Sequence, residues 1–352
     1  MSLAELAVDD LRCIRRAELR LHPGHNLIWG GNAAGKTSLL EAAFILGRGR
    51  SFRTRNSEKL IRQGASQLVV FGRTDGPRSQ TLGVRITRDG GTEARIDATP
   101  AKSLAELSTA FAVQVIEPGT HRLVEEGAHR RRRWMDWAVF HVEPTFIDAW
   151  SLYTRTLKQR NAALRTSPGQ ADVWDPELVR WGEIIAASRR AFVDRLIPLW
   201  QPMVQELVVV PVELHYSRGW NAELTLADAL KGSRERDAHR GLTHAGPHRA
   251  DLVLKTHGSL ARDTLSRGQQ KLVAVALTLA QLKLIRGVTE QVPTLLLDDP
   301  AAELDADRLR QFVGMIAELR CQLVVTALHG NTEVFGQPDR VFHVEQGRVS
   351  PV

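Results

Sequence analysis

The clearest motif in this chain is Gly30-Gly31-Asn32-Ala33-Ala34-Gly35-Lys36-Thr37, which matches the phosphate-binding loop pattern GxxxxGK[ST]. An apolar segment, 26–29, precedes the motif, and a helix-forming segment, 37–43, follows it. In such a strand–loop–helix unit the backbone N–H groups surround phosphate oxygens at the start of the helix. The pattern predicts that residues 30–37 bind a nucleotide, with Lys36 at the β and γ oxygens and Thr37 at Mg²⁺.

An acidic pair, Asp298 and Asp299, follows the apolar run Leu295-Leu296-Leu297. A phosphate loop needs a carboxylate across the sheet to hold the metal and its water shell, and Asp298 has this position. Asp299 would orient or deprotonate the attacking water. By itself the run fits a buried strand ending in an Asp turn equally well, but together with the loop it predicts Lys36, Asp298 and Asp299 as catalytic residues and Thr37 and Asp298 as metal ligands.

A third candidate segment is Leu265-Ser266-Arg267-Gly268-Gln269-Gln270-Lys271, 30 residues before Asp298. Ser266 is predicted to cap a long helix that extends to about residue 285, which would leave the N–H groups of the first turn free for a second anion. An ordinary helix cap without a ligand explains the local pattern as well.

Composition changes in the middle of the chain. Seven of the eight Trp residues but only three of the 27 Gly residues fall between positions 134 and 220. Apolar residues at helical spacing predict two helices there, joined by a loop at 167–176. Short strands and helices alternate on both sides, so we predict one α/β domain in two halves, 1–125 and 238–352, with an inserted helical lobe at 126–237. Helical spacing favours core positions for the tryptophans over base stacking.

The chain has 47 basic and 40 acidic residues among 352, a formal charge of +7. Two basic runs fit contacts with DNA phosphates, although a solvated basic face explains either run alone. The candidate DNA-binding residues are Arg48, Arg50, Arg53, Arg55, Arg130, Arg131, Arg132 and Arg133. Cys13 and Cys321 are predicted to be buried thiols in a reducing, cytosolic compartment, and the sequence predicts neither a signal peptide nor a membrane span.

Several longer strings resemble one family nearly from end to end, the bacterial recombination-mediator family RecF. The strings are GGNAAGKTSLLEA, GRGRSFRT, HRRRRWMDWAVFHVEPTFIDAW, LKQRNAALR, THAGPHRADL, LSRGQQK and LLLDDPAAELD. This resemblance implies a P-loop ATPase head of the ABC and SMC type without a long coiled coil. It also implies an ATP-dependent homodimer in which Ser266, Arg267, Gly268 and Gln269 of one subunit close on the nucleotide of the other.

The same resemblance implies further roles. The segment 302–305 would line the dimer interface, Gln114 would sense the metal, and either Thr326 or His329 would sense the γ-phosphate. The implied function is ATP-dependent binding to duplex DNA near gaps in recombinational repair, replication restart and the SOS response. RecR and RecO are the implied protein partners. Asp299, which is shorter than the Glu expected in transporter ATPases, predicts slow hydrolysis, and the resemblance implies that DNA stimulates it.

Two other function classes share the nucleotide motifs. The ATPase subunit of an ABC transporter would need a groove for a membrane partner. Lys36 and Asp298 lie 262 residues apart, which is a larger separation than we expect in such a subunit. A nucleotide-gated structural clamp without turnover differs from the first hypothesis only in what Asp299 does.

Overall fold

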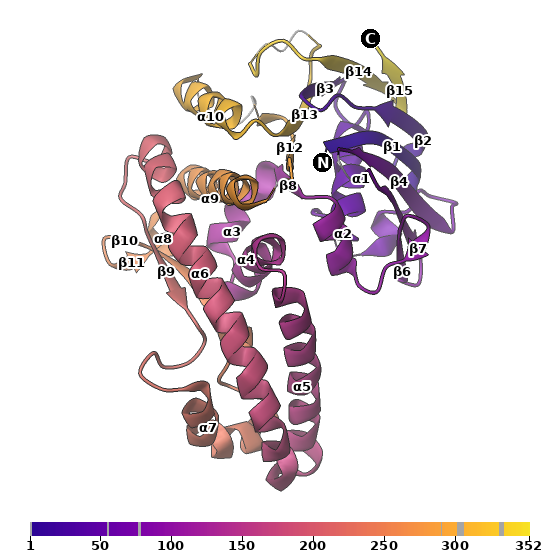
Figure 1. The fold of residues 1–352 in the computed structure, drawn as a ribbon. Helices are drawn as coiled ribbons and strands as arrows, with labels where there is room; N and C mark the ends of the chain where they lie inside the picture. Colours follow the sequence, from indigo (N-terminus) through magenta and orange to yellow (C-terminus); the bar gives the residue numbers. More distant parts are fainter. Residues whose placement is uncertain (1, 55, 77–78, 290, 301–305, 331–333) are drawn as a thin grey trace. The chain divides into compact units, whose positions relative to one another are not determined.

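The computed structural model describes residues 2–54, 56–76, 79–289, 291–300, 306–330 and 334–352, which form two compact units. The first unit comprises 1–120 and 282–352, and the second comprises 121–281. The second unit thus lies between the two parts of the first, with bounds at 121 and 281 where the sequence predicts 126 and 237. The second unit extends beyond residue 237 because it also includes a small sheet formed after the helical hairpin, and the helical residues that follow this sheet carry it to residue 281 (Figure 1).

A six-stranded, mostly parallel sheet positions the motifs of the first unit. Its strand order is β15-β14-β3-β13-β12-β8, and only β15 runs antiparallel to its neighbour. The strands are β3 (His25–Trp29), β8 (Val113–Ile116), β12 (Thr294–Leu297), β13 (Gln322–Ala327), β14 (Arg340–Glu345) and β15 (Arg348–Pro351). Strands β12 and β13 are buried along their whole lengths and are mostly apolar, as expected of parallel strands; their polar residues are Thr294, Gln322 and Thr326.

An antiparallel sheet forms the other half of the first unit, in the order β2-β1-β4-β5-β6-β7. Its strands are β1 (Ser2–Leu11), β2 (Ile14–Arg20), β4 (Gln67–Asp75), β5 (Thr81–Thr87), β6 (Thr92–Ile96) and β7 (Thr99–Pro100). Helix α1 (Lys36–Arg48) is buried at nearly every position and joins both sheets in one hydrophobic core. The helix that starts at the phosphate loop is therefore a central core element.

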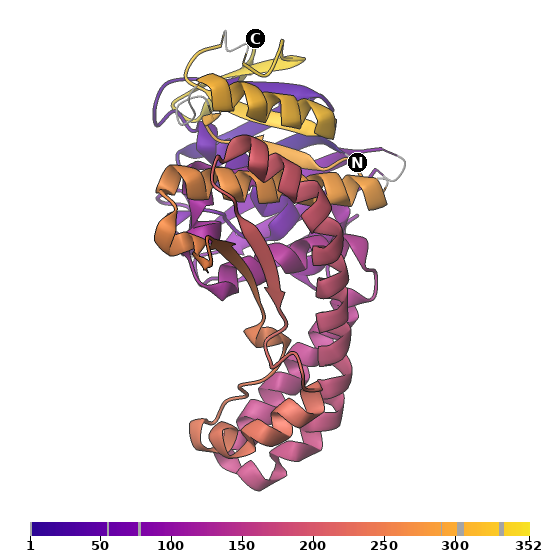
Figure 2. The same cartoon turned by 90° about the vertical axis from the view of Figure 1, so that its left-hand side faces the viewer.

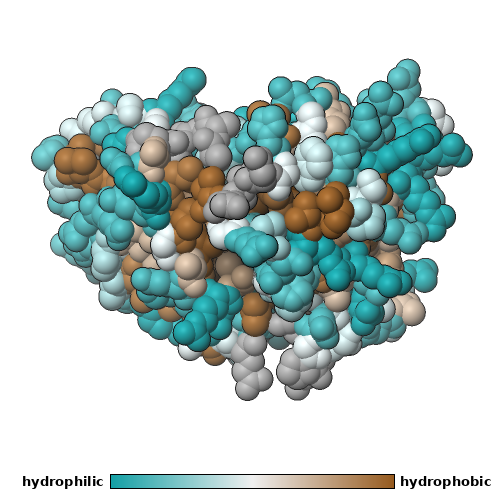
Figure 3. Space-filling view, turned by 90° about the horizontal axis from the view of Figure 1, so that it is seen from above, coloured by the Kyte–Doolittle hydropathy of each residue, from teal (hydrophilic) through white to brown (hydrophobic). Residues whose placement is uncertain are grey.

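The remaining helical segments of the first unit are α2 (Leu104–Ala110), α10 (Ala306–Leu319) and the 3-10 turn η1 (Ser57–Lys59). Two further segments, η2 (Pro118–His121) and α9 (Arg267–Val288), contain residues of both units. Hydrophilic side chains cover most of the surface seen from above in Figure 3. Among the described residues, no helix has the length and apolar character to cross a membrane.

The second unit contains the helical hairpin that the spacing of apolar residues predicts. Helices α5 (Phe146–Thr166) and α6 (Asp175–Leu207) lie side by side and are joined by the 3-10 segment η3 (Pro168–Trp174) (Figure 2). The remaining elements are α3 (Arg122–Glu125), α4 (Ala128–Val142), β9 (Glu213–Ser217), α7 (Leu226–Arg240), η4 (Pro247–Arg249), β10 (Asp251–Thr256), β11 (Ser259–Leu260) and α8 (Ala261–Thr264). Trp137 and Trp200 are fully buried, which confirms a packing role for these two, whereas Trp150 is 39% exposed.

Two arginines of this unit form buried ion pairs. Arg160 is 1% exposed and donates to Asp175 at 2.6 Å and to Asp237 at 2.9 Å. Arg189 forms a two-pronged pair with Asp136, with distances of 2.7 and 3.0 Å. Because each guanidinium faces a carboxylate directly, removing either partner would leave an uncompensated buried charge.

The prediction of two buried thiols is wrong for Cys13, which is exposed in the turn between β1 and β2. The nearest apolar residues of the two strands, Leu11 and Ile14, are buried, but the turn between them reaches the surface. Cys321 is partly buried, and burial raises the pKa of its thiol to about 11.

Candidate nucleotide site

The glycine-rich loop has the backbone that its sequence requires. Gly35, the N-cap of α1, has φ +117°, and Gly30 has φ +157°, conformations that side chains disfavour. A Cβ atom on Gly30 would lie 2.1 Å from the carbonyl oxygen of Val344. The outer part of the loop, residues 31–33, is exposed. The loop thus presents its backbone to solvent at the start of a buried helix.

Lys36 lies inside the curve of this loop. Its ammonium donates to the carbonyl oxygens of Gly30 at 2.7 Å and Gly31 at 3.0 Å, and the side chain is only 9% exposed. These are neutral acceptors, so an anion in the loop would compete for the same charge with a stronger, charge-assisted hydrogen bond.

Thr37 and Asp298 are brought together from positions 261 residues apart. The Thr37 hydroxyl lies 2.9 and 3.1 Å from the two carboxylate oxygens of Asp298. Thr37 follows β3 and Asp298 follows β12, and both parallel strands end at the same edge of the sheet. A hydroxyl and a carboxylate at this spacing supply the oxygen ligands that Mg²⁺ prefers beside phosphate groups.

Asp299 has an unusual backbone. Its φ is +47°, in the left-handed region that non-glycine residues rarely adopt. The Asp299 N–H donates to the hydroxyl of Thr326 at 2.9 Å, and that hydroxyl lies 3.0 Å from a carboxylate oxygen of Asp298. Thr326 is fully buried, whereas His329 is exposed. Of the two candidates for sensing the γ-phosphate, only His329 therefore lies at the surface.

The family resemblance also implies roles for Gln114 and for the segment 302–305. Gln114 lies buried within β8, in register with Leu295, which is three residues before Asp298 on the adjacent strand. It is thus part of the sheet and not of a loop at the sheet edge. The segment 302–305, expected to line a dimer interface, lies outside the described residues.

The predicted helix cap at Ser266 is confirmed and is reciprocal. The Ser266 hydroxyl accepts from the Gln269 N–H at 3.3 Å, and the Gln269 side chain accepts from the Ser266 N–H at 2.9 Å. This pair forms a capping box at the start of α9. Ser266, Arg267 and Gly268 are exposed, so the segment is accessible to a second molecule.

The structure removes Arg48 and Arg131 from the predicted DNA contacts because both are buried. Arg48 is 8% exposed, donates to the Val113 carbonyl at 3.2 Å and stacks on Phe44. Burial lowers the pKa of Arg48 well below its usual value. Arg131 pairs with Asp251 at 2.8 Å and also donates to carbonyl oxygens at the end of α3. Both residues thus organise the fold.

The remaining arginines of the two basic runs differ in accessibility. Arg50 and Arg53 are exposed after α1, while Arg55 lies outside the described residues. In the second run, Arg130 pairs with Glu126 at 2.7 Å. Arg132 donates to the carbonyl of Ala250 at 2.6 Å, and Arg132 and Arg133 are partly buried. The first run therefore offers the more accessible basic surface.

Sequence reasoning missed the contribution of the turn between β1 and β2. Arg12 in this turn binds both oxygens of the fully buried Glu41 of α1. A Cβ atom on Gly35 would lie 3.2 Å from the Cys13 sulfur, so this turn packs directly against the phosphate loop. No sequence motif links Arg12 to Glu41. Their contact depends on the packing of β1 against α1 in the folded chain.

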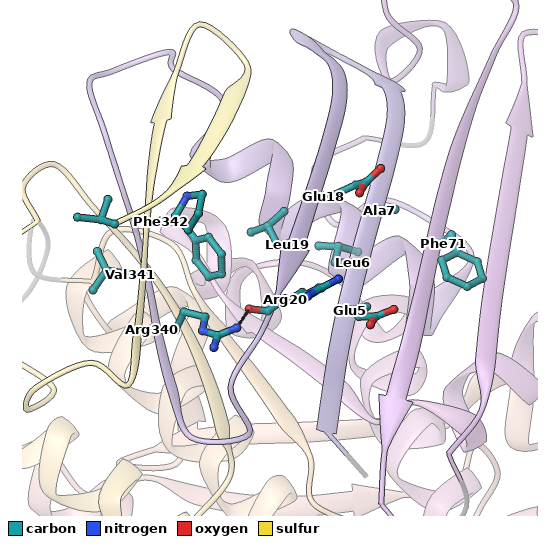
Figure 4. A pocket seen from close by; sticks show the side chains of 12 residues that line it. Glu5, Leu6, Ala7, Glu18, Leu19, Arg20, Phe71, Arg340, Val341 and Phe342 are labelled. Atoms are coloured by element: carbon teal, nitrogen blue, oxygen red, sulfur yellow. Dashed lines mark hydrogen bonds between the residues drawn. The ribbon is translucent and has the colours of Figure 1, made fainter.

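A separate groove of about 790 Å³ in the first unit contains none of the predicted site residues (Figure 4). Arg20 and Arg340 line it together with Glu5 and Glu18, so its charges are balanced. Arg340 donates to the Arg20 carbonyl at 2.9 Å. This groove therefore adds nothing to the candidate nucleotide site.

Comparison with known proteins gives a consistent result. Residues 2–350 match the model of the RecF/RecN/SMC N terminal domain family. The chain is 39% identical over 359 aligned residues to the DNA replication and repair protein RecF of Shewanella baltica (strain OS155 / ATCC BAA-1091), and the alignment covers 100% of both chains. The RecF protein of Shewanella oneidensis has the same identity and coverage.

Solved structures agree with this result. The recombination mediator protein RecF with ATP, of the RecFOR pathway, superimposes with a TM-score of 0.88 at 25% identity, covering 100% of this chain and 97% of that one. An Smc head bound to the C-terminal winged-helix domain of ScpA gives a TM-score of 0.58 at 15% identity, covering 100% and 97%. The second likeness concerns the fold alone and supports the predicted SMC-type head.

Proposed function

Because the chain belongs to the RecF family, we propose that it is an ATP-dependent DNA-binding protein of recombinational repair and replication restart. The observation that carries this proposal is the contact between Thr37 and Asp298, 2.9 Å apart at the edge of the parallel sheet. It completes a phosphate-loop site across 261 residues of sequence. The relatives are named DNA replication and repair proteins, which supports this biological setting.

ATP and Mg²⁺ are the proposed ligands. Residues 30–37 would bind the phosphates, with Lys36 exchanging the carbonyl oxygens of Gly30 and Gly31 for phosphate oxygens. Thr37 and Asp298 would hold Mg²⁺, which neutralises charge on the β- and γ-phosphates when bound. Gln114 is not part of this proposed set, because its register places it three residues before the level of Asp298. The related RecF structure with ATP supports the choice of nucleotide.

Hydrolysis would depend on Asp299. Its carboxylate would orient an attacking water or accept a proton from it, as a general base near the γ-phosphate does. An aspartate reaches one methylene less far than a glutamate from the same backbone position, which favours slow turnover. The hydrogen bond from the Asp299 N–H to Thr326 fixes the backbone from which this side chain extends.

Dimerisation would complete the site. The segment of Ser266, Arg267, Gly268 and Gln269 at the start of α9, of which the first three residues are exposed, would contact the γ-phosphate held by a second subunit. N–H groups at the first turn of a 22-residue helix suit an anion. ATP occupancy would thereby be converted into closure of two subunits around duplex DNA near gaps.

DNA contact is proposed for the exposed arginines Arg50 and Arg53, with a smaller contribution from Arg130, Arg132 and Arg133. These side chains would bind backbone phosphates and would not distinguish base sequences. RecR and RecO are the proposed partners in loading recombinase and in the SOS response, and the cytoplasm is the proposed location. The transporter hypothesis loses support because the family match extends over residues 2–350, including the lobe.

The test is ATP hydrolysis measured with and without duplex DNA, for the wild type and for Lys36→Met. We expect slow hydrolysis that duplex DNA stimulates several-fold, and no hydrolysis above background for Lys36→Met. Sedimentation with Mg-ATP and DNA should show a dimer. Hydrolysis by the wild type without any effect of DNA would overturn the DNA-dependent part of the proposal, and only monomers at saturating nucleotide would overturn the shared site.

A further inference from the structure

Thr326 lies on β13, between the strands that lead to the two halves of the nucleotide site. Strand β13 pairs with β3 on one side and with β12 on the other, and all three are parallel. Thr326 is in register with Ile28 and comes one residue beyond the pair Val325 and Leu297. Its hydroxyl is therefore at the level where Asp298 leaves β12, and the residue is 0% exposed.

The hydroxyl of Thr326 contacts both acidic residues of the pair. It accepts a hydrogen bond from the Asp299 N–H at 2.9 Å. It lies 3.0 Å from a carboxylate oxygen of Asp298 and 3.4 Å from the carbonyl oxygen of Leu297. A hydroxyl has one proton to donate, and the shorter, charge-assisted bond to Asp298 is the stronger of the two choices. One side chain thus fixes the carboxylate of Asp298 and the backbone of Asp299 together.

Binding of Mg²⁺ would make the contact between Thr326 and Asp298 more important for the orientation of the Asp298 carboxylate. In the structure Asp298 accepts from two hydroxyls, those of Thr37 and Thr326. A Thr37 oxygen that ligates Mg²⁺ gives up part of its interaction with Asp298, whereas Thr326 stays within the sheet. Thr326 would then keep the orientation of the Asp298 carboxylate. Its bond to the Asp299 N–H also supports the left-handed backbone of Asp299, whose φ is +47°.

We propose that Thr326 is a positioning residue that couples the metal-binding carboxylate of Asp298 to the backbone of the hydrolytic candidate Asp299. It is not a γ-phosphate sensor, because its hydroxyl is buried and already bonded to these two residues. This inference rests on the proposed function as a Mg-ATP-dependent ATPase. It predicts that the Thr326 hydroxyl is needed for the effect of Mg²⁺ on nucleotide binding and not for contact with the nucleotide itself.

The chain offers a matched control in Thr294, a second fully buried threonine of the same sheet. The Thr294 hydroxyl lies 2.8 Å from the side-chain oxygen of Gln322, at the opposite end of β12 from Asp298. Replacing Thr294 by Val removes a buried hydroxyl from the same sheet with the same change of shape. Any effect common to Thr294→Val and Thr326→Val therefore reports the stability of the sheet and not the nucleotide site.

The experiment measures equilibrium binding of a fluorescent ATP analogue to the full chain, first in EDTA and then over a Mg²⁺ titration. For Thr326→Val we expect affinity in EDTA within about twofold of wild type, a half-maximal Mg²⁺ concentration raised at least fivefold, and a turnover rate lowered at least tenfold. Thr326→Ser, which keeps the hydroxyl, should recover most of the Mg²⁺ response. Thr294→Val should match the wild type in Mg²⁺ dependence.

A double-mutant comparison tests whether Thr326 acts through Asp298. If it does, Thr326→Val should add little to the loss of Mg²⁺ response that Asp298→Asn causes. If Thr326→Val does not fold, Thr326→Ala removes the same hydroxyl with less bulk.

Equal Mg²⁺ dependence for the Thr326 and Thr294 variants, or full additivity with Asp298→Asn, would overturn the inference and leave the proposed function intact. Failure of the wild type to bind the analogue would overturn the proposed function instead.

Discussion

Replacing Arg50 and Arg53 together by Gln should weaken the salt dependence of duplex DNA binding. Both side chains are exposed in the segment that follows α1, whereas their neighbour Arg48 is buried against Phe44 and the carbonyl of Val113. If each exposed arginine neutralises one phosphate, each contributes about 0.9 to the slope of log affinity against log salt concentration. The double variant should therefore lose about 1.8 from this slope.

A slope difference of that size is easy to measure. Over a fourfold rise in salt, from about 50 to about 200 mM, the wild type should lose roughly 12-fold more affinity than the variant does. Fluorescence anisotropy of a labelled duplex with Mg-ATP gives the affinity at each salt concentration. The double variant Arg85→Gln with Arg95→Gln is a control of equal charge change, since these residues are exposed on β5 and β6 of the antiparallel sheet.

Only a difference between the two double variants supports the assignment. If both lower the slope equally, general charge and not this surface determines DNA affinity. If Arg50→Gln with Arg53→Gln leaves the wild-type slope unchanged, the DNA-binding surface lies elsewhere on the molecule, and the reasoning from exposure is refuted.

Three further predictions concern the shared site and the lobe. Ser266→Arg should leave ATP binding by the single subunit within about twofold and abolish hydrolysis, because the exposed cap of α9 would no longer fit against a second subunit; normal hydrolysis would contradict a shared site. Arg131→Met should lower the free energy of unfolding by about 3 kcal/mol, since it leaves Asp251 and the end of α3 without their partner. The control Arg130→Gln should change this free energy by less than about 0.5 kcal/mol. Urea titration followed by tryptophan fluorescence measures the free energy of unfolding of both variants. Burial lowers the pKa of His248 to about 4, so the unfolded chain binds a proton more readily. The contribution of neutral His248 to the free energy of unfolding should be complete above about pH 6.5, and up to about 3 kcal/mol should be lost as the pH falls to 4. His248→Gln should remove most of this pH dependence, and an unchanged pH dependence would contradict the role of His248.

The elements that position the nucleotide site follow from local patterns. The strand at 26–29, the helix from Lys36, the long helix after Ser266 and the apolar strand before Asp298 all occur where the sequence predicts them. These are buried, strongly apolar elements whose ends are marked by glycine or by a capping side chain, so local chemistry specifies them. The helical hairpin of the lobe is predictable for the same reason.

The burial of arginines in the basic runs could not be predicted from the sequence, because the charge of a side chain does not indicate whether it is buried. The arginines at 130–133 look alike in the sequence, yet Arg131 is 7% exposed and pairs with Asp251, 120 residues away. Which arginine of a helical run faces inward depends on the position of a carboxylate on another element. The end of the second unit differs from the predicted residue 237 for a similar reason, since β9 and β10 pair with each other and not with the parallel sheet.

The amino-acid sequence determined the phosphate loop, the acidic pair and the helix cap at Ser266, because each depends on residues within a few positions of one another. The alternation of short strands and helices along the chain determined the α/β architecture in the same way, as a series of local patterns. Tertiary structure decided which distant side chains meet: Thr37 with Asp298, Thr326 with the acidic pair, and Arg12 with Glu41. Strand order and register set these contacts, and they arise from the packing of whole strands around α1. No short stretch of sequence contains that information.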